Sequence, residues 1–140
     1  MKLNPDCIRV VLLCVESSKN YDGSFLFRFS NPLHDFLSDS PLDTSTLSIN
    51  SRPELSGFTE DEVRYHIKQC YDSGLIDMPS NFVPDNCLVN DLTPAGHKFL
   101  AEIREEENWS HIKKLAAKVG CFSLDALAQI STNYISSLLT

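Results

Sequence analysis

Two side chains of the sequence, His66 and Cys70, have the types and spacing of a metal-ligand pair. They are four residues apart, so on a helix an imidazole nitrogen and a thiolate sulfur would lie on one face. A structural zinc site needs two further ligands with comparable pairing, and the sequence offers no such second pair. We therefore expect His66 to be a core histidine that is hydrogen-bonded to the backbone, and we predict no metal and no other cofactor.

Nucleophilic catalysis would need a Ser, Cys or Thr beside a base, usually on a sharp turn flanked by glycines. The five glycines, at positions 23, 57, 74, 96 and 120, are far apart, and each fits a turn, a helix cap or close helix packing. No pair of them lies within a short loop that could cradle a phosphate. The sequence therefore predicts no catalytic residues and a protein that is not an enzyme.

The cysteines and the hydropathy pattern indicate the compartment. Five cysteines occur without any Cys-x-x-Cys pair, and their odd number argues against a disulfide framework. The longest apolar run, residues 10–15, is too short to span a bilayer, and the first six residues lack the shape of a secretory signal. We expect a cytoplasmic protein with reduced thiols and no membrane contact.

The helices that must position these side chains are marked by capping residues. Asn4 before Pro5 begins one helix, Thr59 and Glu62 form a capping box, and Thr93 before Pro94 repeats the first pattern. Apolar residues at helical spacing follow each start. The expected helices cover residues 5–16, 59–73, 94–104, about 108–119 and 124–138. In the fourth of these we expect a buried stripe of Trp109, Ile112, Leu115, Ala116 and Val119.

Strands are expected between the helices. Alternating phenylalanines predict a strand over residues 25–29, and residues 30–57 are mostly loop, with a turn of helix at 33–37 and a short strand at 46–49. A strand that begins at residues 75–78, a wing-like loop over 79–86 and a returning strand over 87–92 would form a hairpin after the helix of residues 59–73. This order predicts an α+β fold, a winged helix-turn-helix.

The domain organisation follows from the same order. Residues 1–104 are expected to form the winged-helix domain, with a loop-rich insertion at about 17–57. Residues 105–140 are expected to form a C-terminal helical extension packed on the same domain. A chain of 140 residues is long enough for one such domain with a real core.

Three blocks of the sequence carry a family resemblance: residues 1–9, residues 65–76, and Leu92-Thr93-x-x-Gly96 continued to Arg104 and Trp109. They resemble a family of small uncharacterised phage and prophage proteins, a domain of unknown function with a predicted winged-helix core. The resemblance does not cover residues 17–57. It implies a phage-type context and a winged-helix fold, and it carries over no catalytic residue.

The charge balance bears on DNA binding. Twelve Lys and Arg stand against nineteen Asp and Glu, a formal net charge of −7, whereas duplex binding depends on cations that neutralise phosphates. The outward face of the helix over residues 59–73 offers Arg64, Tyr65, Lys68 and Gln69 as a candidate recognition surface, but acidic residues surround it. One basic cluster follows Glu105, Glu106 and Glu107, and we favour a solvated helix face over a phosphate-binding patch for it. Its members are His111, Lys113, Lys114 and Lys118.

The last helix has an unusually low charge and a wide apolar surface, which predicts burial against the core and against a second copy. The candidate dimer interface is Leu124, Leu127, Tyr134 and Leu138, within residues 108–138.

We favour a non-enzymatic phage or prophage accessory protein that binds a protein partner, such as a host regulator or defence component, or itself. An acidic chain is repelled by duplex DNA at long range and suits basic protein surfaces. The alternative is a winged-helix transcriptional regulator that binds DNA.

Overall fold

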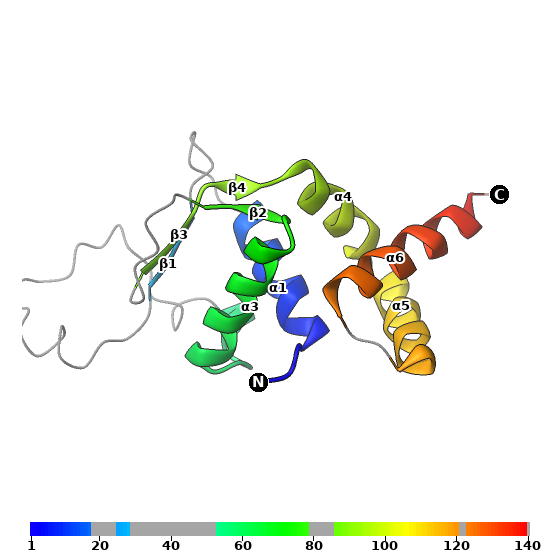
Figure 1. The fold of residues 1–140 in the computed structure, drawn as a ribbon, viewed down its shortest axis with the longest axis horizontal. Coiled ribbons are helices and arrows are strands. Elements are labelled where there is room, and N and C mark those ends of the chain that lie inside the picture. The colour runs from blue at the N-terminus through cyan, green and yellow to red at the C-terminus, as the bar shows by residue number, and fades with distance from the viewer. Residues whose placement is uncertain (18–24, 29–52, 79–85, 121–122, 140) are drawn as a thin grey trace, which may run out of the picture.

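The computed structural model describes residues 1–17, 25–28, 53–78, 86–120 and 123–139, and this part of the chain is mostly helical (Figure 1). It contains five α-helices, one 3-10 helix and four short strands. The helices are α1 (Pro5–Glu16), η2 (Pro53–Leu55), α3 (Glu60–Asp72), α4 (Pro94–Ile103), α5 (Glu106–Val119) and α6 (Leu124–Leu138). The strands are β1 (Phe25–Arg28), β2 (Ile76–Asp77), β3 (Asn86–Val89) and β4 (Asp91–Leu92).

The predicted α+β winged helix-turn-helix is wrong as a fold class. In the described residues the strands are two to four residues long and form two separate antiparallel pairs. Ile76 pairs with Leu92 in β2–β4, so the hairpin expected after α3 is reduced to two residues on each side. β3 pairs instead with β1, which brings Val89 opposite Phe25. The helix-dominated architecture follows because the apolar residues lie mainly on helices and pack helix against helix.

Several expectations fall on residues outside the described ranges. These are the wing loop over residues 79–85, the turn of helix at 33–37, the strand at 46–49 and most of the insertion over residues 17–57. The strand expected over residues 25–29 is present as β1, which ends at Arg28.

Four of the five predicted helix starts are confirmed, and at each of these a side chain caps the helix through a local hydrogen bond. The fifth helix, α5, begins at Glu106 and not at about residue 108, and the side chain of its N-cap Glu105 makes no capping hydrogen bond. The side chain of Asn4 accepts a hydrogen bond from the backbone N–H of Asp6, and Thr59 and Glu62 form the reciprocal capping box. Thr93 and Ser123 cap α4 and α6 in the same way. Gly120, in the left-handed region at φ 75°, ends α5. Among the described residues, no helix is both long and apolar enough to cross a bilayer.

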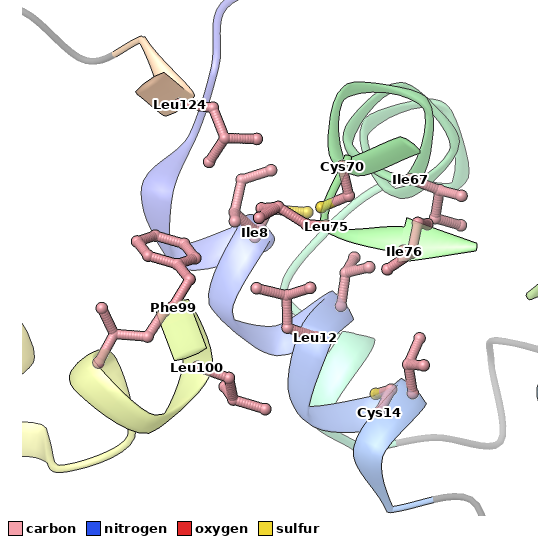
Figure 2. Close-up of a cluster of buried hydrophobic side chains, with 14 of the residues drawn as sticks. Ile8, Leu12, Cys14, Ile67, Cys70, Leu75, Ile76, Phe99, Leu100 and Leu124 are labelled. Atoms are coloured by element: carbon pink, nitrogen blue, oxygen red, sulfur yellow. The ribbon is translucent and has the colours of Figure 1, made fainter. Parts of the chain in front are cut away.

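Helix α1 lies at the centre of the core and contacts α3, α4, β4 and η2. Figure 2 shows Ile8 and Leu12 of α1 with Ile67 and Cys70 of α3 on one side and Phe99 and Leu100 of α4 on the other. The same buried cluster continues to Trp109 and Ile112 of α5 and to Leu124 and Leu127 of α6. Helices α5 and α6 therefore share the hydrophobic core of the preceding elements. Burial of each aliphatic or aromatic side chain of this size stabilises the folded state by about 1.5–3 kcal/mol.

The Leu-Thr-x-x-Gly segment has a specific packing role. The N–H of Thr93 donates to the carbonyl of Leu75 over 3.0 Å, and its hydroxyl donates to the carbonyl of Gly74 over 2.5 Å. A Cβ atom at Gly96 would lie 2.0 Å from the same Leu75 oxygen. The segment therefore joins the start of α4 to the turn that follows α3, and this contact does not require a winged sheet.

Candidate functional site

A groove of about 780 Å³ lies between α5 and α6, which pack against each other at the C-terminal side of the molecule (Figure 1). Its lining residues are His111, Lys114, Leu115, Ala117, Lys118 and Tyr134. Four of the α5 residues, at positions 111, 114, 115 and 118, have the spacing of one helical face. The groove thus brings three members of the predicted basic cluster together with one member of the predicted dimer interface.

An aromatic contact between the two helices lines part of the groove. The rings of His111 and Tyr134 are stacked, with centroids 5.7 Å apart and planes 22° from parallel. Next to them, Leu115 is 39% exposed, although it belongs to a helix whose opposite face is in the core. The groove therefore offers an aromatic pair and a partly exposed leucine side chain.

The cations at the groove differ from most others in the described part of the chain. Arg9, Arg64, Lys68, Arg104 and Lys113 each lie within ion-pair distance of a carboxylate. No ion pair engages the exposed Lys114 or Lys118 within the described residues. The groove consequently carries positive charge in a chain whose net charge is negative.

Lys113, the fourth member of the predicted cluster, has a structural position outside the groove. Its ammonium group donates to the Oδ1 atom of Asp6 over 2.9 Å and lies 5.6 Å from the centroid of the Trp109 ring. The indole N–H of Trp109 donates to the same oxygen over 2.9 Å. Partial burial raises the pKa of Asp6, but the hydrogen bonds from Lys113 and Trp109 and the positive charges of Lys113 and Arg9 together outweigh it and leave that pKa below its ordinary value. Lys113 therefore links α5 to α1.

A second link fixes the junction of α4 and α5. The guanidinium of Arg9 donates to the carbonyl oxygens of Ile103 over 3.0 Å and of Arg104 over 2.7 Å, and it pairs with Glu106 over 3.1 Å. These carbonyl groups lie at the C-terminal end of α4. A cation there donates hydrogen bonds to them and interacts favourably with the negative end of the helix dipole. Arg104 in turn forms a bidentate ion pair with Glu16 of α1. Helix α1 thereby sets the direction of α5, and with it the position of the groove.

The predicted recognition face lies on α3, and its cations are partly neutralised by neighbouring carboxylates. Arg64 lies 3.7 Å from Asp61, and Lys68 lies 3.6 Å from Asp72. Tyr65 and Gln69 are half-buried, and the Tyr65 ring contacts the ring of His66 edge to face. Exposed ion pairs of this kind are weak, but they lower the field that a phosphate backbone would feel.

The prediction of a core histidine is confirmed for His66. Its side chain is fully buried, its Nδ1 atom lies 2.6 Å from the carbonyl oxygen of Glu62, and its Nε2 atom lies 2.7 Å from the backbone nitrogen of Asn4. The Asn4 N–H must donate, so Nε2 is the acceptor and Nδ1 carries the proton. Both nitrogens are thus occupied by the backbone, and neither is available to ligate a metal. The described residues contain no cluster of His, Cys, Asp and Glu that could hold one.

The predicted dimer interface is divided by the structure. Leu124 and Leu127 are buried in the chain's own core, Tyr134 is half-buried beside His111, and Leu138 is 57% exposed. The assignment of Leu124 and Leu127 to a contact with a second copy is therefore corrected, because the monomer already covers both side chains. A charged residue at position 127 would test folding and not association.

Two members of the apolar stripe expected in α5 were misplaced. Leu115 is partly exposed in the groove, and Val119 is 71% exposed near the end of the helix, whereas Trp109, Ile112 and Ala116 are buried as expected. Ala117, which also lines the groove, was not singled out. The available signal was the shared helical face of residues 111, 114, 115 and 118, in which one leucine lies among basic residues.

Comparisons with known proteins give a family and one relative. The family described as Hypothetical protein (DUF2513) matches residues 2–122. A protein from Haemophilus influenzae (strain ATCC 51907 / DSM 11121 / KW20 / Rd), titled Uncharacterized protein, is 29% identical over 143 residues, and the match covers 99% of each chain. No solved structure matches the chain.

Proposed function

We propose that this chain, which belongs to the family described as Hypothetical protein (DUF2513), is a non-enzymatic accessory protein of the cytoplasm that binds a protein partner. The observation that carries the proposal is the groove between α5 and α6. It combines exposed apolar and aromatic surface with lysines that have no carboxylate partner in the described residues. An exposed apolar surface rimmed by polar groups is typical of a protein interaction site.

The resemblance of the sequence to phage and prophage proteins suggests the context. In that context the partner class that we propose is a host regulator or a defence component. The net charge of −7 favours a protein over duplex DNA, because long-range repulsion slows the approach of a polyanion.

The alternative, a DNA-binding transcriptional regulator, has weaker support. It would require the α3 face to contact phosphates, but Arg64 and Lys68 each lie beside a carboxylate on their own helix. A DNA-binding face normally gains affinity from several cations that are free to neutralise phosphates.

The test is affinity capture of the tagged full chain in nuclease-treated bacterial lysate, followed by titration of the purified captured protein. The wild type is compared with Lys114→Glu/Lys118→Glu and with the control Lys2→Glu/Lys98→Glu. The control replaces two exposed lysines outside the groove and changes the net charge equally. We expect a captured protein that binds the wild type and the control but not the groove variant.

Binding of a duplex oligonucleotide at physiological salt would contradict the proposal, provided that it is steeply salt-dependent and that no protein binds with similar strength. A captured protein that binds both double variants equally would also exclude the groove as the site of binding.

A further inference from the structure

We infer that the groove between α5 and α6 accepts an acidic amphipathic helix of the partner protein, with its apolar side chains on Leu115 and Tyr134 and its carboxylates near Lys114 and Lys118. This inference rests on the proposed function and specifies the chemistry of the partner. It depends on the shape, the polarity and the charge of the groove.

The shape and the apolar surface of the groove favour a partner helix with an apolar stripe. Two packed helices leave between them a channel in which the ridge of a third helix can lie. Along this channel the partly exposed Leu115 and the half-buried Tyr134, stacked on His111, offer apolar contact surface. Side chains of the partner at i, i+3 or i+4, and i+7 would cover this surface.

The chain as a whole is acidic, and its net charge predicts a basic partner surface. At the groove the local charge is positive, and it favours carboxylates on the segment of the partner that binds there. Lys114 and Lys118 are one turn apart, both are exposed, and neither has an ion pair in the described residues. Two acidic side chains one turn apart, on the edge of the partner's apolar stripe that faces α5, would each lie within reach of one ammonium group. Such rim contacts fix orientation and raise the association rate more than they raise affinity.

A nucleic acid fits this surface less well than a peptide. Two lysines and one histidine neutralise few phosphates, and phosphate contacts supply most of the non-specific affinity for nucleic acid. The side chain of Leu115 would displace water from the phosphates of a nucleic acid without offering them a hydrogen-bond partner.

A second copy of the chain also fits less well. A two-fold symmetric contact places the same surface of each copy against the other. Lys114 and Lys118 would then lie close to their own counterparts, and like charges in an interface oppose association.

The experiment uses the full-length chain and a fluorescent synthetic helix of about 15 residues, roughly four turns, with leucines at helical spacing and glutamates at both edges. A matched peptide has lysine in place of every glutamate, and binding is measured by fluorescence anisotropy. We expect the acidic peptide to bind at least about tenfold more tightly than the basic one, because attraction at two lysines becomes repulsion.

Variants of the chain locate the binding. Lys114→Glu/Lys118→Glu should weaken binding of the acidic peptide by about tenfold, and the control Lys2→Glu/Lys98→Glu should leave it near the wild-type value. Leu115→Gln tests whether the apolar side chain of Leu115 contributes to binding. Leu139→Gln is its control, because Leu139 is 83% exposed and lies outside the groove lining. Equal binding of the acidic and basic peptides to the wild-type chain would overturn the inference. An equal loss of peptide binding in the groove and control variants would also overturn it.

Two further outcomes would assign the groove differently. Competition of the acidic peptide by an oligonucleotide would indicate nucleic acid, and dimerisation that Leu115→Gln abolishes would indicate a second copy. If neither peptide binds but a captured protein still depends on Lys114 and Lys118, the chemistry assigned to the partner is wrong and the proposed function stands.

Discussion

Gly96 gives the sharpest test of how the start of α4 is held. A Cβ atom at this position would lie 2.0 Å from the carbonyl oxygen of Leu75, and ordinary contact begins at 3.4 Å. Substitution by alanine must therefore move α4 and the turn apart by about 1.4 Å, the difference between these two distances. Both sides of the contact are backbone, so no flexible side chain can absorb the movement.

The cost can be estimated from the contacts at this joint. Overpacking of a tight site costs about 1–3 kcal/mol, and loss of the two hydrogen bonds from Thr93 to the turn costs about 1 kcal/mol each. The higher helix propensity of alanine offsets about 1 kcal/mol. We expect Gly96→Ala to lower the free energy of unfolding by about 2–4 kcal/mol, a large part of the total for a domain of this size.

The matched control is Gly57→Ala. Gly57 is exposed, and a Cβ atom there would meet nothing within 4 Å. Its substitution should leave stability unchanged or raise it by about 0.4–1 kcal/mol, because alanine restricts the unfolded chain. Both variants are measured by urea unfolding, with fluorescence of the single tryptophan, Trp109, as the signal. Free energies of unfolding for the two variants that agree to within about 0.5 kcal/mol would refute the close-contact argument.

Three further predictions concern α1. Arg9→Lys should lower the free energy of unfolding by about 1–3 kcal/mol in urea titrations, because one ammonium group cannot replace three guanidinium contacts. The pKa of Asp6 is lowered on folding, so its contribution is complete above the ordinary value of 3.8 and is lost as the pH falls below it. Asp6→Asn should therefore flatten the acid limb of a stability profile, and an unchanged limb would contradict this. Burial raises the pKa of Cys7 from 9.0 to about 12, so stability should fall as the pH rises through that interval, and Cys7→Ala should reduce the fall.

Four of the five helix starts were predictable because the signals that set them are local, whereas the start of α5 has no capping side chain. Asn4, Thr59, Thr93 and Ser123 each cap a helix through a backbone N–H only two or three residues ahead. The burial of His66 beside backbone partners was also expected, since an isolated histidine on an apolar helical face has few other ways to satisfy its nitrogens.

Strand pairing and side-chain contacts over long separations were not predictable in the same way. Residues 87–92 have the character of one strand, but their pairing is divided between β1 and β2. Nothing near Arg9 in the sequence indicates that its guanidinium binds a carbonyl oxygen at the end of a helix, 94 residues away. The winged-helix prediction failed here, because the Leu-Thr-x-x-Gly segment encodes a backbone contact between α4 and a turn and leaves the size of the sheet open.

The orientation of α5 follows from the faces that its neighbours require. Trp109 and Lys113, one turn apart, are both held by Asp6 of α1, and Ile112 and Ala116 are buried in the core. With these two sides fixed, positions 111, 114, 115 and 118 lie on the exposed side of α5, which borders the groove beside α6. The ion pair that removes Lys113 from the basic cluster thus determines where Lys114 and Lys118 are presented. A partner that binds in the groove would accordingly favour the arrangement in which α1 and α5 are joined, and its binding should be coupled to the stability of that contact.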